Sequence, residues 1–342
     1  MNRRDFLTTI TPLVTAAVVA AADELDLFDP QSTPIYPRIA EPAAPNITAA
    51  PAVAPMPGPV LWKPTAGKAV VIENTHMVDN PLRVKGGQLS AGVPQLILRD
   101  VLAVKCGPLV QLRNVDQVVL ERVASVDAYA SGTYGLGLIR LTDRIGSLRV
   151  SDFRWEGAQE APNTSDAWSV INLWGKDADD TCSDWQIRRG VIRNARMGSG
   201  SNYLNADGIS TERGHTNGII EDIFIEGVSD AGIDCKGVGC RIRQVEVRDA
   251  RQSFKLWSSG EHGRLVSRDP RFAHIISKPG ATIVIERLEV SGDPTKPLVA
   301  FEDGPSHVII KSGDWSPEQK LAKFDGAAGA TLTLPDGKVV RA

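Results

Sequence analysis

A motif that returns after 22 residues is the feature that most constrains the fold of this chain. Ile220-Glu-Asp-Ile223-Phe-Ile225 recurs as Ile242-Arg-Gln-Val245-Glu-Val247, and both copies are rich in the residues that form strands. A repeat of this length, with Gly, Asn and Asp between the strands, is typical of one coil of a parallel β-solenoid. We therefore predict that strands of neighbouring coils stack about 4.8 Å apart.

The pattern of one apolar, two polar and one apolar residue can be followed through most of the chain. Its first members are separated by 22, 30, 37, 33, 22 and 43 residues, which a coil of about 22 residues with loops inserted at some corners explains. A β-sandwich or propeller would also have many short strands, but Asn-Gly hairpin turns are scarce here. The sequence therefore favours an all-β fold, a right-handed single-stranded parallel β-helix with a short C-terminal cap. The first members of the pattern are Leu98, Leu120, Val150, Ile187, Ile220, Ile242 and Ile285.

Residues 1–22 have the features of an export signal. The pair Arg3-Arg4 precedes Phe6 and an apolar run that ends in small residues. This pattern is typical of the twin-arginine type of signal peptide, which serves proteins exported in the folded state. We therefore expect the protein to be periplasmic or secreted. The apolar run is too short and too rich in alanine for a stable membrane span.

Three further segments follow the predicted signal peptide. Residues 23–66 hold 10 of the 22 prolines and few large apolar residues, so we expect an extended linker there. Residues 67–313 carry the strand pattern and should form the β-helix domain, and residues 314–342 should form the C-terminal cap. Within the cap, Ser316 before a proline predicts the start of a short helix, and Asp336-Gly337 predicts a hairpin turn.

Charge and cysteine usage narrow the classes of partner. The formal net charge is −3, and nothing in the sequence indicates a broad basic surface, so we expect no nucleic-acid partner. We also expect the protein to be a monomer. Cys106, Cys182, Cys235 and Cys240 would meet an oxidising compartment after export. Cys235 and Cys240 bracket four residues and could close a small loop, or all four cysteines could be buried free thiols. CxxC pairs and clustered histidines, which a zinc site would need, are missing.

Four residues on three successive predicted coils carry most of the chemical information. Asp207 and Asp230 are 23 residues apart, and Lys255 follows Asp230 by 25. Asp234 lies close behind Asp230, and Gly232 between them permits a bend that would let both reach one ion. A single aspartate at a solenoid corner usually bonds turn amides. Three carboxylates with a lysine on one face favour a metal site.

The segments that hold these residues read NADG, SDAGID and SFKLW. In this order they resemble the motifs of polysaccharide lyase family 9, the pectate lyase-like parallel β-helix proteins, over about residues 200–260. The resemblance implies that Asp207, Asp230 and Asp234 bind Ca²⁺ and that Lys255 is the base that removes a proton from the uronic-acid ring. The family generally has a second aspartate where this chain has Ala231, so we expect weaker calcium binding.

The chemistry of β-elimination accounts for these residue types. The C5 proton of a uronate is only weakly acidic, and a hard cation that neutralises the sugar carboxylate also stabilises the enolate-like intermediate. The base must be neutral part of the time, so the pKa of Lys255 has to fall. We expect an acidic polysaccharide to be the partner. The candidate substrate-binding residues are Arg251, Arg264, Arg268 and Trp257.

Two other functions stay open from the sequence alone. NADG resembles the NTD motif of polygalacturonases, which would indicate a glycoside hydrolase with paired carboxylates. However, Lys255 occupies the segment where that family has a histidine. A non-catalytic polysaccharide-binding β-helix is the second alternative, because Ala231 removes one expected ligand.

Overall fold

The computed structural model describes residues 61–62, 69–78, 83–85, 93–128, 137–158, 168–175, 182–197 and 205–342. These residues form strands, turns and loops, and within them no helix is long and apolar enough to cross a membrane. The predicted signal peptide lies outside the described residues, and so does the predicted linker apart from Leu61–Trp62. These two residues form the first strand, β1, inside the segment expected to be a linker.

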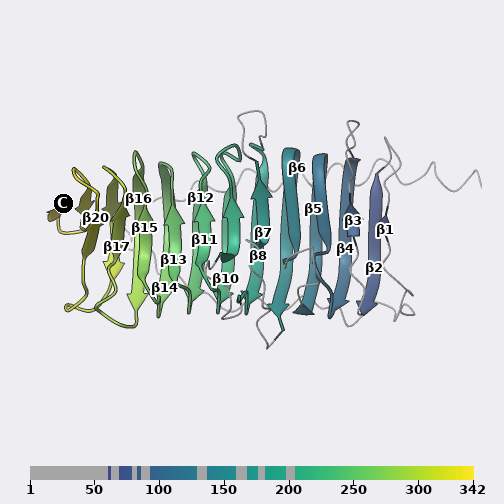
Figure 1. Cartoon of the computed structure of the whole chain (residues 1–342), viewed down its shortest axis with the longest axis horizontal. Coiled ribbons are helices and arrows are strands. Elements are labelled where there is room, and N and C mark those ends of the chain that lie inside the picture. The colour runs from purple at the N-terminus through teal and green to yellow at the C-terminus, as the bar shows by residue number, and fades with distance from the viewer. Residues whose placement is uncertain are drawn as a thin grey trace, which may run out of the picture. The chain divides into compact units, whose positions relative to one another are not determined.

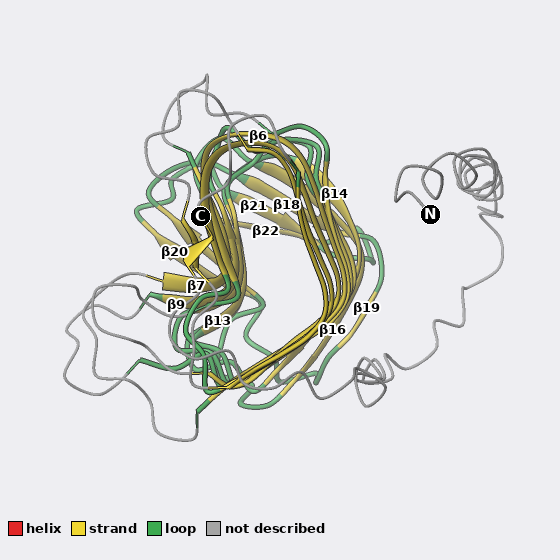
Figure 2. Cartoon of the chain, turned by 90° about the vertical axis from the view of Figure 1, so that its right-hand side faces the viewer, coloured by secondary structure: helices red, strands yellow, loops and turns green. Residues whose placement is uncertain are grey.

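All the described strands belong to one sheet, which winds into coils so that each coil lays one strand in each of two runs (Figures 1 and 2). The anchor run consists of β2 (Val70–Val78), β4 (Val93–Val104), β5 (Val110–Ala128), β6 (Ile139–Gly157), β8 (Trp185–Arg193), β10 (Ile219–Glu226), β12 (Arg241–Arg248), β14 (Gly260–Arg268), β16 (Thr282–Ser291), β18 (His307–Ile310) and β21 (Thr331–Thr333). The site run consists of β1, β3 (Arg83–Lys85), the first residues of β5 and β6, β7 (Trp168–Trp174), β9 (Ala206–Thr211), β11 (Ala231–Cys235), β13 (Gln252–Leu256), β15 (Ala273–Ser277), β17 (Val299–Glu302) and β20 (Ala322–Asp325).

Parallel pairing along each run confirms the coiled, all-β architecture. Ile220 pairs with Ile242 on one side and with Ile187 on the other, as the 22-residue repeat predicts. Every inter-strand pairing is parallel except that of β21 with the last strand, β22 (Val339–Arg341). The result is a mostly parallel sheet that winds nearly closed around an apolar interior, with a solenoid-like arrangement of its strands.

The corner of each coil explains why the anchor pattern has two polar residues between its apolar ones. In a straight strand, residues three apart point to opposite faces, yet Ile220 and Ile223 are both fully buried. The residue before Ile223, Asp222, has a φ of 55°, and this left-handed residue turns the strand so that both isoleucines face inward. Equivalent corner residues of successive coils have φ values of 50° to 55°: Asp100, Arg122, Asp152, Arg189, Asp222 and Gln244.

Charges alternate along this ladder of corner residues. Arg122 bonds Asp100 through two contacts of 2.6 and 2.9 Å, and Arg189 bonds Asp152 through two of 2.7 and 2.8 Å. The hydrogen bonds from Arg122 hold the pKa of Asp100 below its ordinary value, so the pairs are charged at neutral pH. Because these side chains are partly exposed, each pair adds little stability, about 1 kcal/mol or less.

The expectation that an inserted loop accounts for the longest interval of the anchor pattern is wrong. The 43 residues between Ile242 and Ile285 contain a complete coil, because β14 lies between β12 and β16 and His262 pairs with Ile285. His262 occupies the anchor position that other coils give to Ile, Leu or Val, and its Nδ1 accepts the N–H of Ile242 at 3.3 Å. Because a histidine occupies the anchor position of this coil, a pattern that requires apolar anchor residues does not detect the coil.

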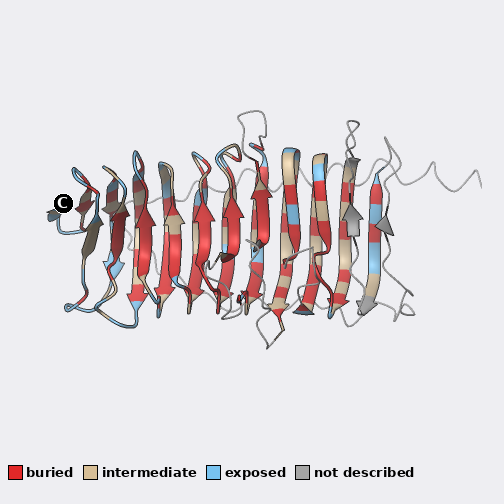
Figure 3. Cartoon of the chain, viewed as in Figure 1, coloured by how far each residue is buried: buried red, intermediate tan, exposed pale blue. Residues whose placement is uncertain are grey.

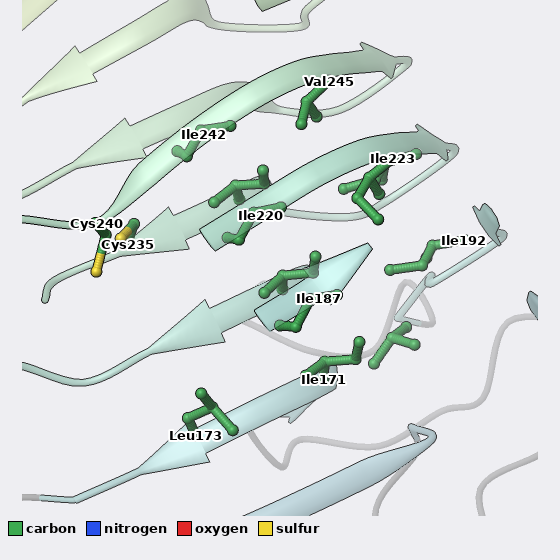
Figure 4. Packing of buried hydrophobic residues seen from close by; sticks show 14 of the residues in the cluster. Ile171, Leu173, Ile187, Ile192, Ile220, Ile223, Cys235, Cys240, Ile242 and Val245 are labelled. Atoms are coloured by element: carbon green, nitrogen blue, oxygen red, sulfur yellow. The ribbon is translucent and has the colours of Figure 1, made fainter. Parts of the chain in front are cut away.

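The interior is filled by the same kind of residue in coil after coil. Ile187, Ile220 and Ile242 lie one above another on β8, β10 and β12 (Figure 4), and all three are fully buried. Figure 3 shows that this burial extends along the strands of most coils. Burying each such side chain contributes about 1.5–3 kcal/mol relative to leaving it exposed. Neighbouring coils therefore hold one another in register.

The C-terminal region confirms one sequence prediction and corrects another. β21 and β22 form the hairpin predicted around Asp336-Gly337. The helix predicted from Ser316 is absent, and the segment makes a single turn in which Gln319 N donates to Ser316 O. The chain cannot continue as a helix there because Lys320 N donates to Pro294 O and β20 then pairs with β17.

Candidate functional site

The candidate site lies on the site run, where β9, β11 and β13 stack in parallel. Asp234 pairs with Ser210 on one side and with Lys255 on the other. Asp207 lies on β9, and its Oδ1 accepts the N–H of Ala231 at 2.9 Å. The register therefore places Asp234 beside Lys255, and it places Asp207 beside Ala231, where Asp234 and Lys255 still act on its charge.

Glycines next to the acidic residues let the strands pack closely on the interior. A Cβ at Gly208 would lie 2.5 Å from Gly232 O, and a Cβ at Gly232 would lie 2.5 Å from Cγ1 of Val247. Neither glycine is among those with positive φ. Gly232 is therefore required because a side chain at this position would clash with Val247 of the anchor run. The special backbone bend that its position between two aspartates suggested is not the reason.

Asp207 and Asp230 are almost completely enclosed. Asp207 accepts, besides the Ala231 N–H, a long bond of 3.3 Å from Ser169 Oγ. Asp230 lies just before β11, and its Oδ1 accepts bonds from Gln252 Nε2 at 3.1 Å and Arg251 Nη1 at 3.3 Å. Sequence reasoning missed Ser169 and Gln252, because a lone polar residue in a strand carries no signal before the register is known.

Asp234 and Lys255 form the centre of the group. Lys255 Nζ lies 3.3 Å from Asp234 Oδ2, and Trp257 Nε1 donates to Asp234 Oδ1 at 2.6 Å. The Lys255 side chain is 17% exposed, whereas Phe254 and Leu256 are buried in the core. This confirms that strand alternation turns Lys255 outward toward the carboxylates.

Burial and like charge set the protonation of the group. Burial raises the pKa of Asp207 well above its ordinary value, and Asp234 and Asp230 raise it further. Burial also raises the pKa of Asp230, against the opposing effect of Lys255 and Arg251. A proton on Asp207 or Asp230, or a cation beside them, would therefore offset the cost of burying their charges.

The pKa of Lys255 moves in the direction opposite to the one that a base requires. Burial lowers this pKa, but Asp234, Asp230 and Asp207 raise it by more, so it lies above its ordinary value. Lys255 is therefore protonated at neutral pH in this arrangement. Any group that neutralised the carboxylates would remove the cause of the increase.

The carboxylates are not gathered around one point. Within the described ranges, no group of three or more His, Cys, Asp or Glu side chains is arranged to hold a metal ion. Both oxygens of Asp234 are engaged, by Lys255 and by Trp257.

The candidate substrate-binding residues divide between the two runs. Trp257 follows β13, with its ring centroid 5.4 Å from Lys255 Nζ, and the half-exposed Arg251 borders Asp230. Arg264 and Arg268 lie instead on β14 of the anchor run, where they form ion pairs with Glu289 and Glu246. The structure does not bring these two arginines to the Lys255 group, because the segment after Lys255 is a coil and not an insertion.

The strand register also shows how the three segments of the candidate site align with one another. Gly208-Ile209-Ser210, Gly232-Ile233-Asp234 and Ser253-Phe254-Lys255 are paired residue for residue or follow in line from pairs that are. Ser210 therefore lies beside Asp234 and was missed, although aligning the three segments on Ile209, Ile233 and Phe254 would have found it. The chain matches no known protein-family model, no curated protein and no solved structure.

Proposed function

We propose that the chain is an exported polysaccharide lyase that cleaves a uronic-acid-containing polysaccharide by β-elimination, as its resemblance to polysaccharide lyase family 9 implies. The observation that carries the proposal is the position of Lys255, which faces outward in register with Asp234 and beside two further buried carboxylates. An isolated surface lysine would have no such surroundings.

Lys255 is the proposed base. Its neutral form would take the C5 proton of the uronate, with the Trp257 ring beside Nζ. Because only the neutral amine can accept a proton, turnover is expected to rise with pH. Arg251, which is half-exposed beside Asp230, is positioned to bind a carboxylate of the substrate.

Calcium fits the residues by donor chemistry. Carboxylate oxygens are the ligands that Ca²⁺ prefers, and burial raises the pKa values of Asp207 and Asp230, so that a bound cation would stabilise their charged forms. Asp207, Asp230 and Asp234 would hold the ion, with Asp234 exchanging its contact to Lys255 for the metal. The bound ion would neutralise the substrate carboxylate and so acidify the C5–H bond.

A finer description of the fold belongs to the same proposal. We infer that the coil is right-handed, because connections between parallel strands are right-handed in about 98% of cases. A crystal structure checks the hand directly. A left-handed coil would separate this chain from the pectate lyase-like proteins.

The activity is tested by following ultraviolet absorbance of unsaturated products over a panel of uronate polymers, with and without EDTA. We expect absorbance to rise with at least one polymer and to stop in EDTA. Lys255→Ala should abolish the signal, whereas Lys311→Ala, which removes an exposed lysine paired with Glu286, should not. No product from any uronate polymer would contradict the proposal.

A non-catalytic polysaccharide-binding protein is the second candidate. The ion pair of Lys255 with Asp234, and the raised pKa that accompanies it, favour this function because they keep the lysine charged. Binding of a uronate polymer in affinity electrophoresis without any unsaturated product would establish it.

A further inference from the structure

Two cysteines that the proposed reaction does not use lie together at the turn between β11 and β12. Cys235 ends β11 and Cys240 precedes β12, and Figure 4 shows their side chains side by side at the edge of the interior. Both are free and buried. Each also contacts the coil before it: Cys235 Sγ lies 3.6 Å from Thr211 Oγ1 and Cys240 Sγ lies 3.5 Å from His215 O.

The turn between the cysteines is built so that the chain comes back on itself. Gly239 has a φ of 71°, which favours glycine, and a Cβ on Gly237 would lie 1.8 Å from His215 O and 2.9 Å from Cys240 Sγ. Asn217 N donates to Val238 O at 2.9 Å, which fixes the tip of the turn against the previous coil. Glycines at these two positions therefore bring the two sulfur atoms within reach of each other.

We propose that Cys235 and Cys240 are a disulfide-forming pair whose oxidation closes the turn 236–239 beside the candidate site. In this step both S–H bonds break and one S–S bond forms, while two protons and two electrons pass to an oxidised dithiol or glutathione disulfide that is thereby reduced.

The turn links the pair to the candidate site. Lys236 Nζ pairs with Glu212 at 2.6 Å and lies 5.5 Å from the centroid of the Trp257 ring, and Ser258 Oγ donates to Lys236 O at 2.7 Å. Trp257 in turn bonds Asp234. Closing the disulfide would limit the movement of a turn that borders the site whether or not the site is catalytic.

The pair is tested on the whole folded chain equilibrated with glutathione buffers of increasing oxidised fraction. After acid quenching, free thiols are alkylated in denaturant, the chain is digested, and the peptide masses are measured. We expect a peptide pair that joins Cys235 to Cys240, lighter by two hydrogens, to replace the alkylated forms, while Cys106 and Cys182 stay alkylated. The variant C182S should behave as the wild type, and C240S should lose the linked product while circular dichroism shows an unchanged fold.

A second arm removes the protection that burial gives. The chain is unfolded, reduced and refolded in the most oxidising buffer, so that the oxidant reaches every sulfur. If Cys235 and Cys240 are still alkylated as fully as Cys106 and Cys182, or carry only separate glutathione adducts, the proposal is overturned. A linked product in this arm with none in the native arm supports the pair and shows that it forms during folding.

Discussion

Acidification is expected to weaken the fold through one buried ring, that of His262. The side chain is 3% exposed at an anchor position of the interior, and its Nε2 has no hydrogen-bond partner within the described part of the chain. Burial lowers the pKa of His262 from 6.5 to about 4. The folded chain therefore resists a proton that the unfolded chain accepts readily.

The sign and size of the effect follow from these two pKa values. Between pH 6.5 and pH 4 the unfolded state binds more protons at this position, so stability is complete above pH 6.5 and is lost as the pH falls toward 4. A pKa difference of about 2.5 corresponds to about 3 kcal/mol, of which about 2 kcal/mol should already be lost at pH 5. This is a large share of the 5–15 kcal/mol, roughly, that holds a typical domain together.

The assay compares the wild type with His262→Gln in denaturant titrations at pH 7, 5 and 4. Glutamine keeps an acceptor for the Ile242 N–H but has no proton to gain. The buried His274, whose pKa burial also lowers to about 4, is present in both proteins and cancels. We expect the unfolding free energy of the wild type to fall by about 2 kcal/mol more than that of the variant between pH 7 and pH 5. Parallel pH profiles would refute the reasoning.

Three further predictions concern the site and the core. Lys255→Arg should reduce turnover by about 10²–10⁴-fold, as Lys255→Ala should, because guanidinium stays protonated; an Arg variant that remains active on a polymer the wild type cleaves would exclude Lys255 as the base. In calorimetry, Asp207→Ala should abolish calcium binding and Ala231→Asp should strengthen it, and an unchanged affinity in the second variant would mean that position 231 does not face the ion. Gly218→Ala would place a Cβ 1.8 Å from Cε2 of Trp185 and should destabilise the chain by about 1–3 kcal/mol, which a drop in the denaturation midpoint checks.

Much of the fold could be predicted from the sequence because coils repeat the same packing problem. Ile220 and Ile242 meet as the repeat indicates, since the apolar interior tolerates few residue types at those positions. The coil that contains His262 was not predicted, because a buried imidazole ring can replace an aliphatic side chain when its nitrogen bonds the neighbouring backbone. A search for apolar residues at the anchor positions cannot detect that substitution.

The candidate site was predicted less completely because register is a property of pairs of strands. Spacing indicated that Asp230 and Lys255 belong together, but the structure pairs Lys255 with Asp234. A few residues more or fewer at a corner change which side chains meet, and sequence intervals of 23 and 25 cannot decide between the two aspartates. The charge of Lys255 likewise depends on all three carboxylates at once.

The alternating charges at the coil corners make the solenoid sensitive to whether coils are lost singly or in twos. Deleting the coil of Arg122 would bring Asp100 next to Asp152, two like charges on neighbouring strands, which is destabilising. Deleting the coils of Arg122 and Asp152 together would bring Asp100 next to Arg189 and keep the opposite signs in contact. Shortening or lengthening of this ladder by recombination should therefore succeed more readily when an even number of coils is removed or added.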